Sequence, residues 1–197
     1  MLTMRIMMMT TTINRMEPEP WKKISEEVKG DFRIFKIRDI VYESPRTGKE
    51  HRFYRLEGND WINVIPITED NEVVMVKQYR MGTETVELEV PGGILENNEK
   101  PEEAAIRELE EETGYRGITS RYLGAVKPNP AIQDNLCHTV LIEGVKRVSE
   151  QNLDPGEDIV VELVPYSKIS ELIENGTIRH SLVICAFHLL KQNIKDY

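Results

Sequence analysis

The sequence predicts an α+β fold in which a mixed β-sheet is packed between helices. Between residues 32 and 164, short runs in which apolar and polar side chains alternate indicate strands that are buried on one face. Turn-forming residues separate several neighbouring runs, which favours antiparallel hairpins. Three segments, 101–113, 167–174 and 180–193, have the pattern of helices instead. This mixture is typical of a sheet covered by helices.

Size and charge narrow the class of protein. The 197 residues suit one domain with a small extension, and 40% of them are hydrophobic, which is enough for a core. The net charge of −9 argues against a nucleic-acid binder, because the phosphate backbone attracts a basic surface. No run approaches the ~18 apolar residues that span a membrane. Cys137 and Cys185 are expected to be buried free thiols, and we expect a cytoplasmic protein.

The first 60 residues are expected to contain a tail and a β extension. Residues 1–29 are expected to form a disordered or loosely packed tail without the apolar stretch of a signal peptide. Alternation over 32–42 and 51–56, on either side of a turn-forming segment, predicts an antiparallel hairpin within an extension of residues 30–60. An isolated hairpin is marginally stable in water, so we expect it to pack against a second copy of the chain in a homodimer.

Residues 61–197 are predicted to form the main domain. The ends of its helix 101–113 are marked, because Pro101 suits the first helical turn and Gly114 suits the position after the last one. The predicted strands of the domain are 63–68, 72–79, 86–90, 118–127, 136–145 and 157–164.

The helix 101–113 carries a stripe of acidic residues. At about 100° per residue, Glu108, Glu111 and Glu112 lie within a sector of about 100°. Arg107 is placed to pair with Glu103 and Glu111. The stripe is typical either of a solvated acidic helix or of a site for Mg²⁺ or Mn²⁺, which prefer carboxylate oxygens. The expected buried face consists of Ala105, Ile106, Leu109 and Thr113.

The spacing of residues around this helix favours the metal site. Gly93, Glu99 and residues 107–115 together resemble the signature of the Nudix hydrolase superfamily. The resemblance implies a Nudix-type α/β/α sandwich with a mixed sheet. It also implies hydrolysis of a nucleoside diphosphate that is linked to another group.

The same resemblance implies a set of metal ligands. Glu108 and Glu112 match the principal ligands of a divalent cation, Mg²⁺ or Mn²⁺. Glu111 matches a third acid that joins the metal shell or the catalytic machinery, and the carbonyl of Gly92 matches a further ligand. Arg107 is expected to support catalysis by holding a carboxylate in place.

Three further features are similar to the branch of the superfamily that hydrolyses ADP-ribose and nucleoside diphosphate sugars. Residues 78–80 and 87–93 resemble the segments that precede its metal helix, and Pro130 lies where the branch has a proline. The N-terminal hairpin also matches and implies a dimer. The loop 128–131 departs from the Pro-Ser-Pro-Gly pattern of dedicated ADP-ribose enzymes, which favours sugar nucleotides more broadly.

Substrate contacts are expected from residues before and after the metal helix in the sequence. Arg80 is expected to clamp the diphosphate, since a guanidinium can donate two parallel hydrogen bonds to phosphate. Glu89 and Pro130 are expected to line the substrate site. Trp61 or Tyr79 is expected either to stack on the base or to belong to the core.

A general base is expected on the loop 154–159, because in the similar enzymes this group often follows the metal helix. Glu157 matches the acidic position, and Asp158 is the second candidate. His138 lies in an apolar strand and is expected to be buried and hydrogen-bonded rather than catalytic. Two alternative functions stay open: hydrolysis of another nucleotide, such as a dinucleoside polyphosphate or an oxidised nucleotide, and a non-catalytic nucleotide-sugar sensor.

Overall fold

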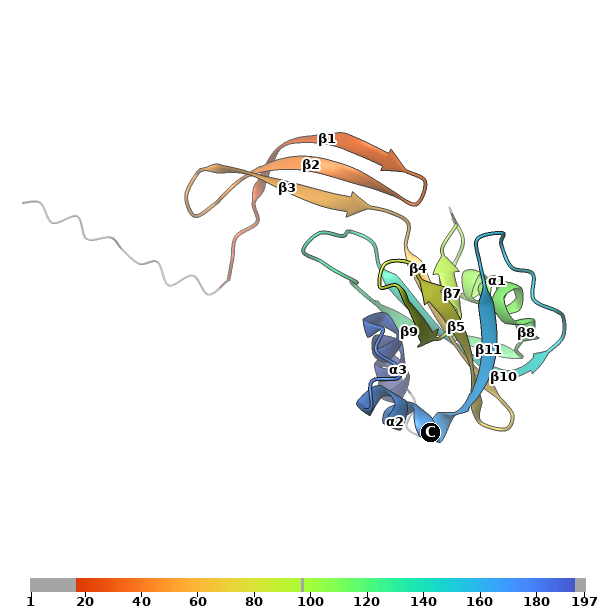
Figure 1. Cartoon of the computed structure of the whole chain (residues 1–197). Helices are drawn as coiled ribbons and strands as arrows, with labels where there is room; N and C mark the ends of the chain where they lie inside the picture. The colour runs from red at the N-terminus through yellow and green to blue at the C-terminus, as the bar shows by residue number, and fades with distance from the viewer. Residues whose placement is uncertain (1–16, 97, 194–197) are drawn as a thin grey trace, which may run out of the picture.

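The structure of the chain is a computed structural model that describes residues 17–96 and 98–193. A three-stranded N-terminal sheet extends away from a larger body, in which a mixed sheet is packed between helices (Figure 1). The predicted fold class is therefore confirmed. No helix within the described residues is long and apolar enough to cross a membrane.

The N-terminal sheet contains one strand more than the predicted hairpin. Its strands are β1 (Lys22–Phe32), β2 (Phe35–Glu43) and β3 (Glu50–Glu57), antiparallel in that order. The expected loose tail is wrong for residues 22–29, which belong to β1, while residues 1–16 lie outside the described residues. Most side chains of β1 are exposed, so the strand carries little of the apolar alternation that indicates a strand.

The main sheet combines parallel and antiparallel strands. Its strands are β4 (Trp61–Thr68), β5 (Glu72–Arg80), β6 (Thr85–Glu89), β7 (Gly92–Ile94), β8 (Tyr115–Arg116), β9 (Thr119–Val126), β10 (Cys137–Arg147) and β11 (Ile159–Pro165). The order is β11-β5-β4-β10-β8, with β6 beside β5, β7 beside β4 and β9 beside β10. β4 and β10 are parallel, and the other pairs are antiparallel.

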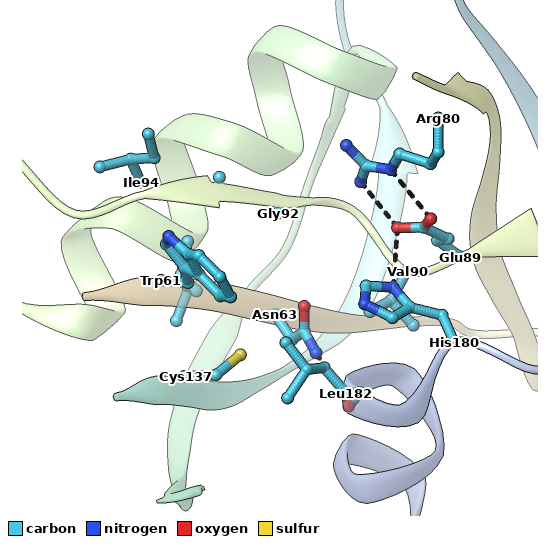
Figure 2. Close-up of a pocket in the computed structure, with 12 residues that line it drawn as sticks. Trp61, Asn63, Arg80, Glu89, Val90, Gly92, Ile94, Cys137, His180 and Leu182 are labelled. Carbon is cyan, nitrogen blue, oxygen red and sulfur yellow. Dashed lines mark hydrogen bonds and ion pairs between the residues drawn. The ribbon is translucent and has the colours of Figure 1, made fainter. Parts of the chain in front are cut away.

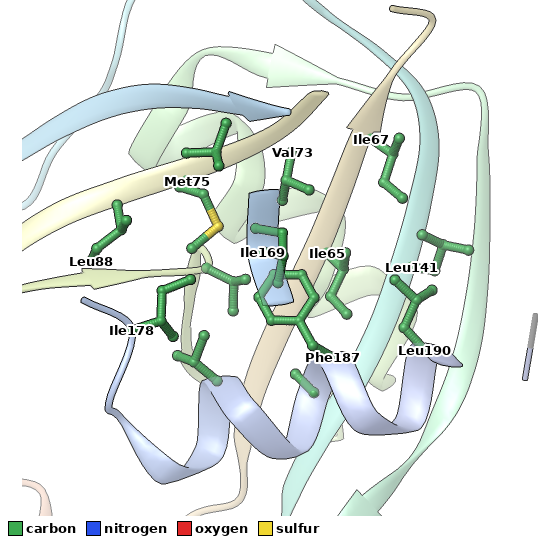
Figure 3. Close-up of a cluster of buried hydrophobic side chains, with 14 of the residues drawn as sticks. Ile65, Ile67, Val73, Met75, Leu88, Leu141, Ile169, Ile178, Phe187 and Leu190 are labelled. Carbon is green, nitrogen blue, oxygen red and sulfur yellow. The ribbon is translucent and has the colours of Figure 1, made fainter. Parts of the chain in front are cut away.

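Helices cover both faces of the main sheet. They are α1 (Pro101–Thr113), α2 (Ile169–Glu174), which follows a 3-10 turn at Tyr166–Lys168, and α3 (Ser181–Asn193). Alternate residues of β4 point to opposite faces, so Ile65 packs with Phe187 of α3 (Figure 3), whereas Val64 packs with Leu109 of α1. This central strand is buried on both faces, and α1 is held firmly against one of them.

Helix α1 begins and ends where the sequence predicts. Pro101 occupies its first turn, and the side chain of Glu103 accepts a hydrogen bond from the backbone N–H of Lys100 at 3.2 Å. Gly114 follows the last turn with a φ of 73°, a conformation that favours glycine. The expected pair between Arg107 and Glu103 is not formed, because Glu103 caps the helix.

The buried face of α1 differs from the predicted one. Ile106, expected inside, is 43% exposed. Glu108 and Glu112 are 9% and 4% exposed, so two of the three acids of the stripe face the interior. Ala105 and Leu109 are buried as expected. Buried carboxylates are costly without partners. The burial of Glu108 and Glu112 therefore indicates a functional site rather than a solvated helix surface.

The N-terminal sheet is joined to the body at the loop between β9 and β10. The backbone N–H of Leu56 donates to the carbonyl of Ile132 at 2.7 Å, and Arg55 lies 3.1 Å from the carboxylate of Asp134. These contacts hold the loop that carries Pro130 against β3.

Candidate active site

The strand β7 approaches α1 closely because its first two residues are glycines. A Cβ atom on Gly92 would lie 2.1 Å from the carbonyl oxygen of Ile62, and one on Gly93 would lie 2.2 Å from Oε1 of Glu108. The backbone N–H of Gly92 donates to Oε2 of Glu112 at 3.0 Å. Glycine at position 92 therefore lets β7 lie close against β4, and glycine at position 93 leaves room for the carboxylate of Glu108.

The two buried acids are held in an environment that opposes their negative charge. Burial raises the pKa of Glu112 to about 8 against the hydrogen bond from Gly92, and the charges of Glu108 and Glu157 raise it further. Burial also raises the pKa of Glu108, although Arg107 acts against it. Paired acids with raised pKa values in one place are typical of functional sites.

Arg107 connects three acids, of which one precedes α1 and two lie on its second half. Its Nε and Nη2 donate to Glu99 at 2.9 and 3.0 Å, and its Nη1 donates to Glu108 at 2.8 Å and to Glu111 at 3.1 Å. The hydrogen bonds from Arg107 hold the pKa of Glu99 below its usual value. The residue thus contacts carboxylates of the stripe as expected, and its support of catalysis stays a prediction.

Arg80 and Glu89 form a forked pair at the ends of β5 and β6. Nε and Nη2 of Arg80 donate to the two carboxylate oxygens of Glu89 at 2.9 and 2.7 Å. Burial acts to raise the pKa of Glu89, but Arg80 and His180 outweigh it and lower the pKa to about 2. Glu89 is 3% exposed, whereas 44% of the Arg80 side chain is exposed. Arg80 therefore keeps donors that can reach a ligand.

A cavity of about 350 Å³ lies between this pair and the indole of Trp61 (Figure 2). Gly92 and Gly93 contribute to its wall, so the cavity adjoins the glycines that approach the acids of α1. The exposed Tyr79 lies outside this wall, which leaves Trp61 as the aromatic residue placed to contact a bound group.

The loop before β11 is fastened to the end of α1. Nε2 of Gln151 donates to the carbonyl of Glu112 at 2.6 Å, and the backbone N–H of Asn152 donates to the carbonyl of Glu111 at 2.8 Å. Glu157 is partly exposed on this loop, accepts a hydrogen bond from the Asp154 backbone at 3.0 Å, and acts electrostatically on Arg80, Glu108 and Glu112. The structure therefore brings Glu157 near the acids, while Asp158 is exposed.

Pro130 and His138 lie in other surroundings. Pro130 lines a separate cavity of about 540 Å³, whose other walls include Trp21, Phe53 and Tyr54 from and beside the N-terminal sheet. Within this chain it is not brought together with Arg80 and Glu89. His138 contacts the hydroxyl of Tyr122 at 3.0 Å and Asp60 at 3.1 Å, as expected for a hydrogen-bonded histidine.

His180 belongs to the site but is not predicted by the sequence. It lines the cavity beside Glu89, with its Nδ1 3.2 Å from Oε2 of that residue (Figure 2). A single histidine before a helix forms no local pattern, so only the fold reveals this contact. Within the described residues, no three or more His, Cys, Asp or Glu side chains are grouped as they would be around a metal ion.

Comparisons with known proteins agree with this geometry. Residues 60–187 match the NUDIX domain. The ADP-ribose pyrophosphatase of Bacillus subtilis is 29% identical over 175 residues, 86% of this chain and 95% of that protein, and mouse ADP-sugar pyrophosphatase is 34% identical over 139 residues, 64% and 63%. A crystal structure of an ADP compounds hydrolase matches with a TM-score of 0.81 and 22% identity, over 91% of this chain and 96% of that one. The chain therefore belongs to the Nudix hydrolase family.

Proposed function

We propose that the chain hydrolyses the diphosphate linkage of ADP-ribose or of a related nucleoside diphosphate sugar, and that the products are a nucleoside monophosphate and a sugar phosphate. The observation that carries this proposal is a cavity lined by Arg80 and by Gly92 and Gly93. These two glycines approach the buried acids Glu108 and Glu112. The names of the relatives from Bacillus subtilis and mouse support the substrate class.

The acids of α1 fit a divalent cation, Mg²⁺ or Mn²⁺. Glu112 is 4% exposed, and no cationic side chain among the described residues forms an ion pair with it. We assign Glu108, Glu111 and Glu112 as carboxylate ligands and the carbonyl of Gly92 as a further one. A bound cation would neutralise diphosphate charge and acidify a water molecule.

The residues of the chain then divide the work of hydrolysis. Arg80 holds the diphosphate through the donors that Glu89 leaves free. Glu157 accepts a proton from the attacking water while the oxygen of that water bonds to one phosphorus of the diphosphate. The bond between this phosphorus and the bridging oxygen breaks, and the other phosphate leaves with the bridging oxygen. Arg107 keeps Glu108 and Glu111 in place through hydrogen bonds of 2.8 and 3.1 Å.

The N-terminal sheet is proposed to form a homodimer. Several large apolar side chains on or beside it are exposed: Trp21, Ile24, Val28, Phe32, Ile34, Phe53 and Tyr54. A second copy of the chain would bury them, and it could bring the wall around Pro130 to a substrate site. Light scattering at micromolar concentration is expected to show twice the chain mass of 22.8 kDa, and a monomer contradicts this assignment.

The free thiols Cys137 and Cys185 support a cytoplasmic location.

A panel of nucleotide sugars, incubated with Mg²⁺ and analysed by mass spectrometry, tests the proposed reaction. AMP and ribose 5-phosphate are expected from ADP-ribose, with other nucleoside diphosphate sugars also cleaved at the diphosphate. Release of free sugar and a nucleoside diphosphate would contradict the assignment. Exclusive cleavage of dinucleoside polyphosphates or oxidised nucleotides, or tight binding without turnover, would favour the alternatives.

A further inference from the structure

Two cavities share one wall at the ends of β5 and β6. The cavity beside Trp61, shown in Figure 2, and a second one of about 740 Å³ are both lined by Arg80, Glu89 and His180. Arg80 ends β5, Glu89 ends β6, and His180 directly precedes α3. Two paired strands and a residue that lies far from them in the sequence therefore meet at the proposed diphosphate clamp.

Glu89 is the central residue of this wall. Its carboxylate accepts both hydrogen bonds of the Arg80 fork on one side, and Nδ1 of His180 lies 3.2 Å from Oε2 on another. The contact with His180 lacks the geometry of a regular hydrogen bond, and Nδ1 is buried without another partner among the described residues. A buried donor without a partner is costly, so a small rotation that completes the bond to Glu89 is favoured.

The backbone at His180 is held to α3 and, through Leu182, to β4. Its carbonyl accepts a hydrogen bond at 3.1 Å from the N–H of Ile184, a residue in the first turn of α3. Nδ2 of Asn63 in β4 donates to the carbonyl of Leu182 at 3.0 Å, and both of these residues are buried. The imidazole is thus presented to Glu89 from a segment that is anchored to the main sheet.

We infer that His180 is a positioning residue for Arg80 and acts through Glu89; the inference rests on the proposed role of Arg80 as the diphosphate clamp. A guanidinium has five N–H donors, and Glu89 occupies two of them along one edge. The plane of the carboxylate therefore sets the direction of the remaining three. His180 restrains that carboxylate, so its loss lets Arg80 turn away from a substrate.

A double-mutant cycle on ADP-ribose hydrolysis tests this role. His180→Ala is expected to raise KM about 5- to 20-fold with kcat changed less than about 3-fold, because it weakens substrate binding rather than the chemical step. In an Arg80→Ala background the same change is expected to raise KM less than about 2-fold, because the residue that it positions is gone. An equal penalty in both backgrounds, or no penalty in the wild-type background, overturns the inference.

Two variants serve as controls. Arg179 is adjacent to His180 but contacts Glu87 at 3.4 Å. Glu87 lies two residues before Glu89 on β6. Arg179→Ala is therefore expected to change KM less than about 2-fold. His180→Asn keeps an N–H donor near the position of Nδ1 and is expected to recover at least half of the lost affinity. If His180→Ala does not fold, His180→Asn still tests the inference. In that case a KM of His180→Asn equal to the KM of Arg80→Ala contradicts it.

A measurement without substrate separates this inference from the proposed function. The Nε–H signal of Arg80 in a nitrogen-15 NMR spectrum, identified by its loss in Arg80→Ala, is expected to shift or broaden in His180→Ala. An unchanged signal overturns the positioning role. If the wild-type chain hydrolyses no nucleoside diphosphate sugar, the proposed function fails, whereas the Arg80 signal still decides whether His180 positions this side chain.

Discussion

The backbone N–H of Gly92 donates a hydrogen bond to Oε2 of Glu112 at 3.0 Å and so joins β7 to α1. This contact holds a carboxylate that is 4% exposed. It requires glycine, because a Cβ atom at residue 92 would collide with the backbone of β4 at Ile62. The glycines before α1 and the acids on α1 are therefore parts of one arrangement.

Glu112→Gln is expected to reduce kcat by a factor of about 10³ or more, because a neutral amide removes a charge that a divalent cation needs. The melting temperature in EDTA is expected to change little, since a side chain with a pKa of about 8 is mostly protonated at pH 7 and glutamine has a similar shape. Initial rates and thermal unfolding measure the two effects. The control is Glu110→Gln, which removes a surface ion pair with Arg116. Near-normal turnover of Glu112→Gln would contradict the assignment of Glu112 as a metal ligand.

Gly92→Ala is expected to lower the free energy of unfolding by about 1–3 kcal/mol, because the added Cβ would lie 2.1 Å from a backbone oxygen that cannot easily move. Gly82→Ala is the matched control. Nothing lies within 4 Å of a Cβ at residue 82, so a change below about 0.5 kcal/mol is expected. Urea unfolding of the three proteins compares them, and equal losses at both glycines would show that close approach is not the cause.

Glu89 is expected to make stability depend on pH in the acidic range. Its pKa is lowered from 4.5 to about 2 in the folded chain, so its contribution is present above about pH 4.5 and is lost as the pH falls toward 2. The full contribution is about 3 kcal/mol. Relative to Glu89→Gln, the wild-type chain is expected to be more stable at pH 6 and to lose this advantage near pH 2. A difference that stays constant across a urea-unfolding pH series contradicts the lowered pKa.

The two cysteines are expected to differ in reactivity. Burial raises the pKa of Cys137 to about 12, so its thiol stays protonated at pH 8 and is a poor nucleophile. Cys185 is partly exposed and provides the internal comparison. In the folded protein, iodoacetamide is expected to label Cys185 before Cys137, and mass spectrometry of the peptides measures the order. Equal labelling rates would place Cys137 in a more open position.

Much of the fold follows from local patterns in the sequence. Pro101 and Gly114 mark the ends of α1, and alternation indicates the long strands. β1 escapes this reasoning because its side chains are largely exposed on both faces. Ile106 and Glu112 lie on the opposite sides from those expected, since periodicity places acids in solvent and a functional site can bury them.

The candidate site is predictable only in part. The spacing from Gly93 to the acids of α1 forms a recognisable pattern, and the loop with Glu157 follows from similarity to a family. His180 forms no such pattern, because its contact with Glu89 joins β6 to the start of α3 and depends on the tertiary packing. Pro130 matches a family position, yet within one chain it lines a different cavity.

The central claim is that Glu157 and the acids of α1 form one hydrolytic centre, and kcat for ADP-ribose in Glu157→Gln tests it most directly. The loop of Glu157 is fastened to α1 through Gln151 and Asn152, so the substitution is expected to leave the fold intact. With saturating Mg²⁺, kcat is expected to fall by about 10²–10⁴ while substrate and metal binding stay nearly unchanged. An unchanged kcat, or a loss confined to KM, would contradict the account.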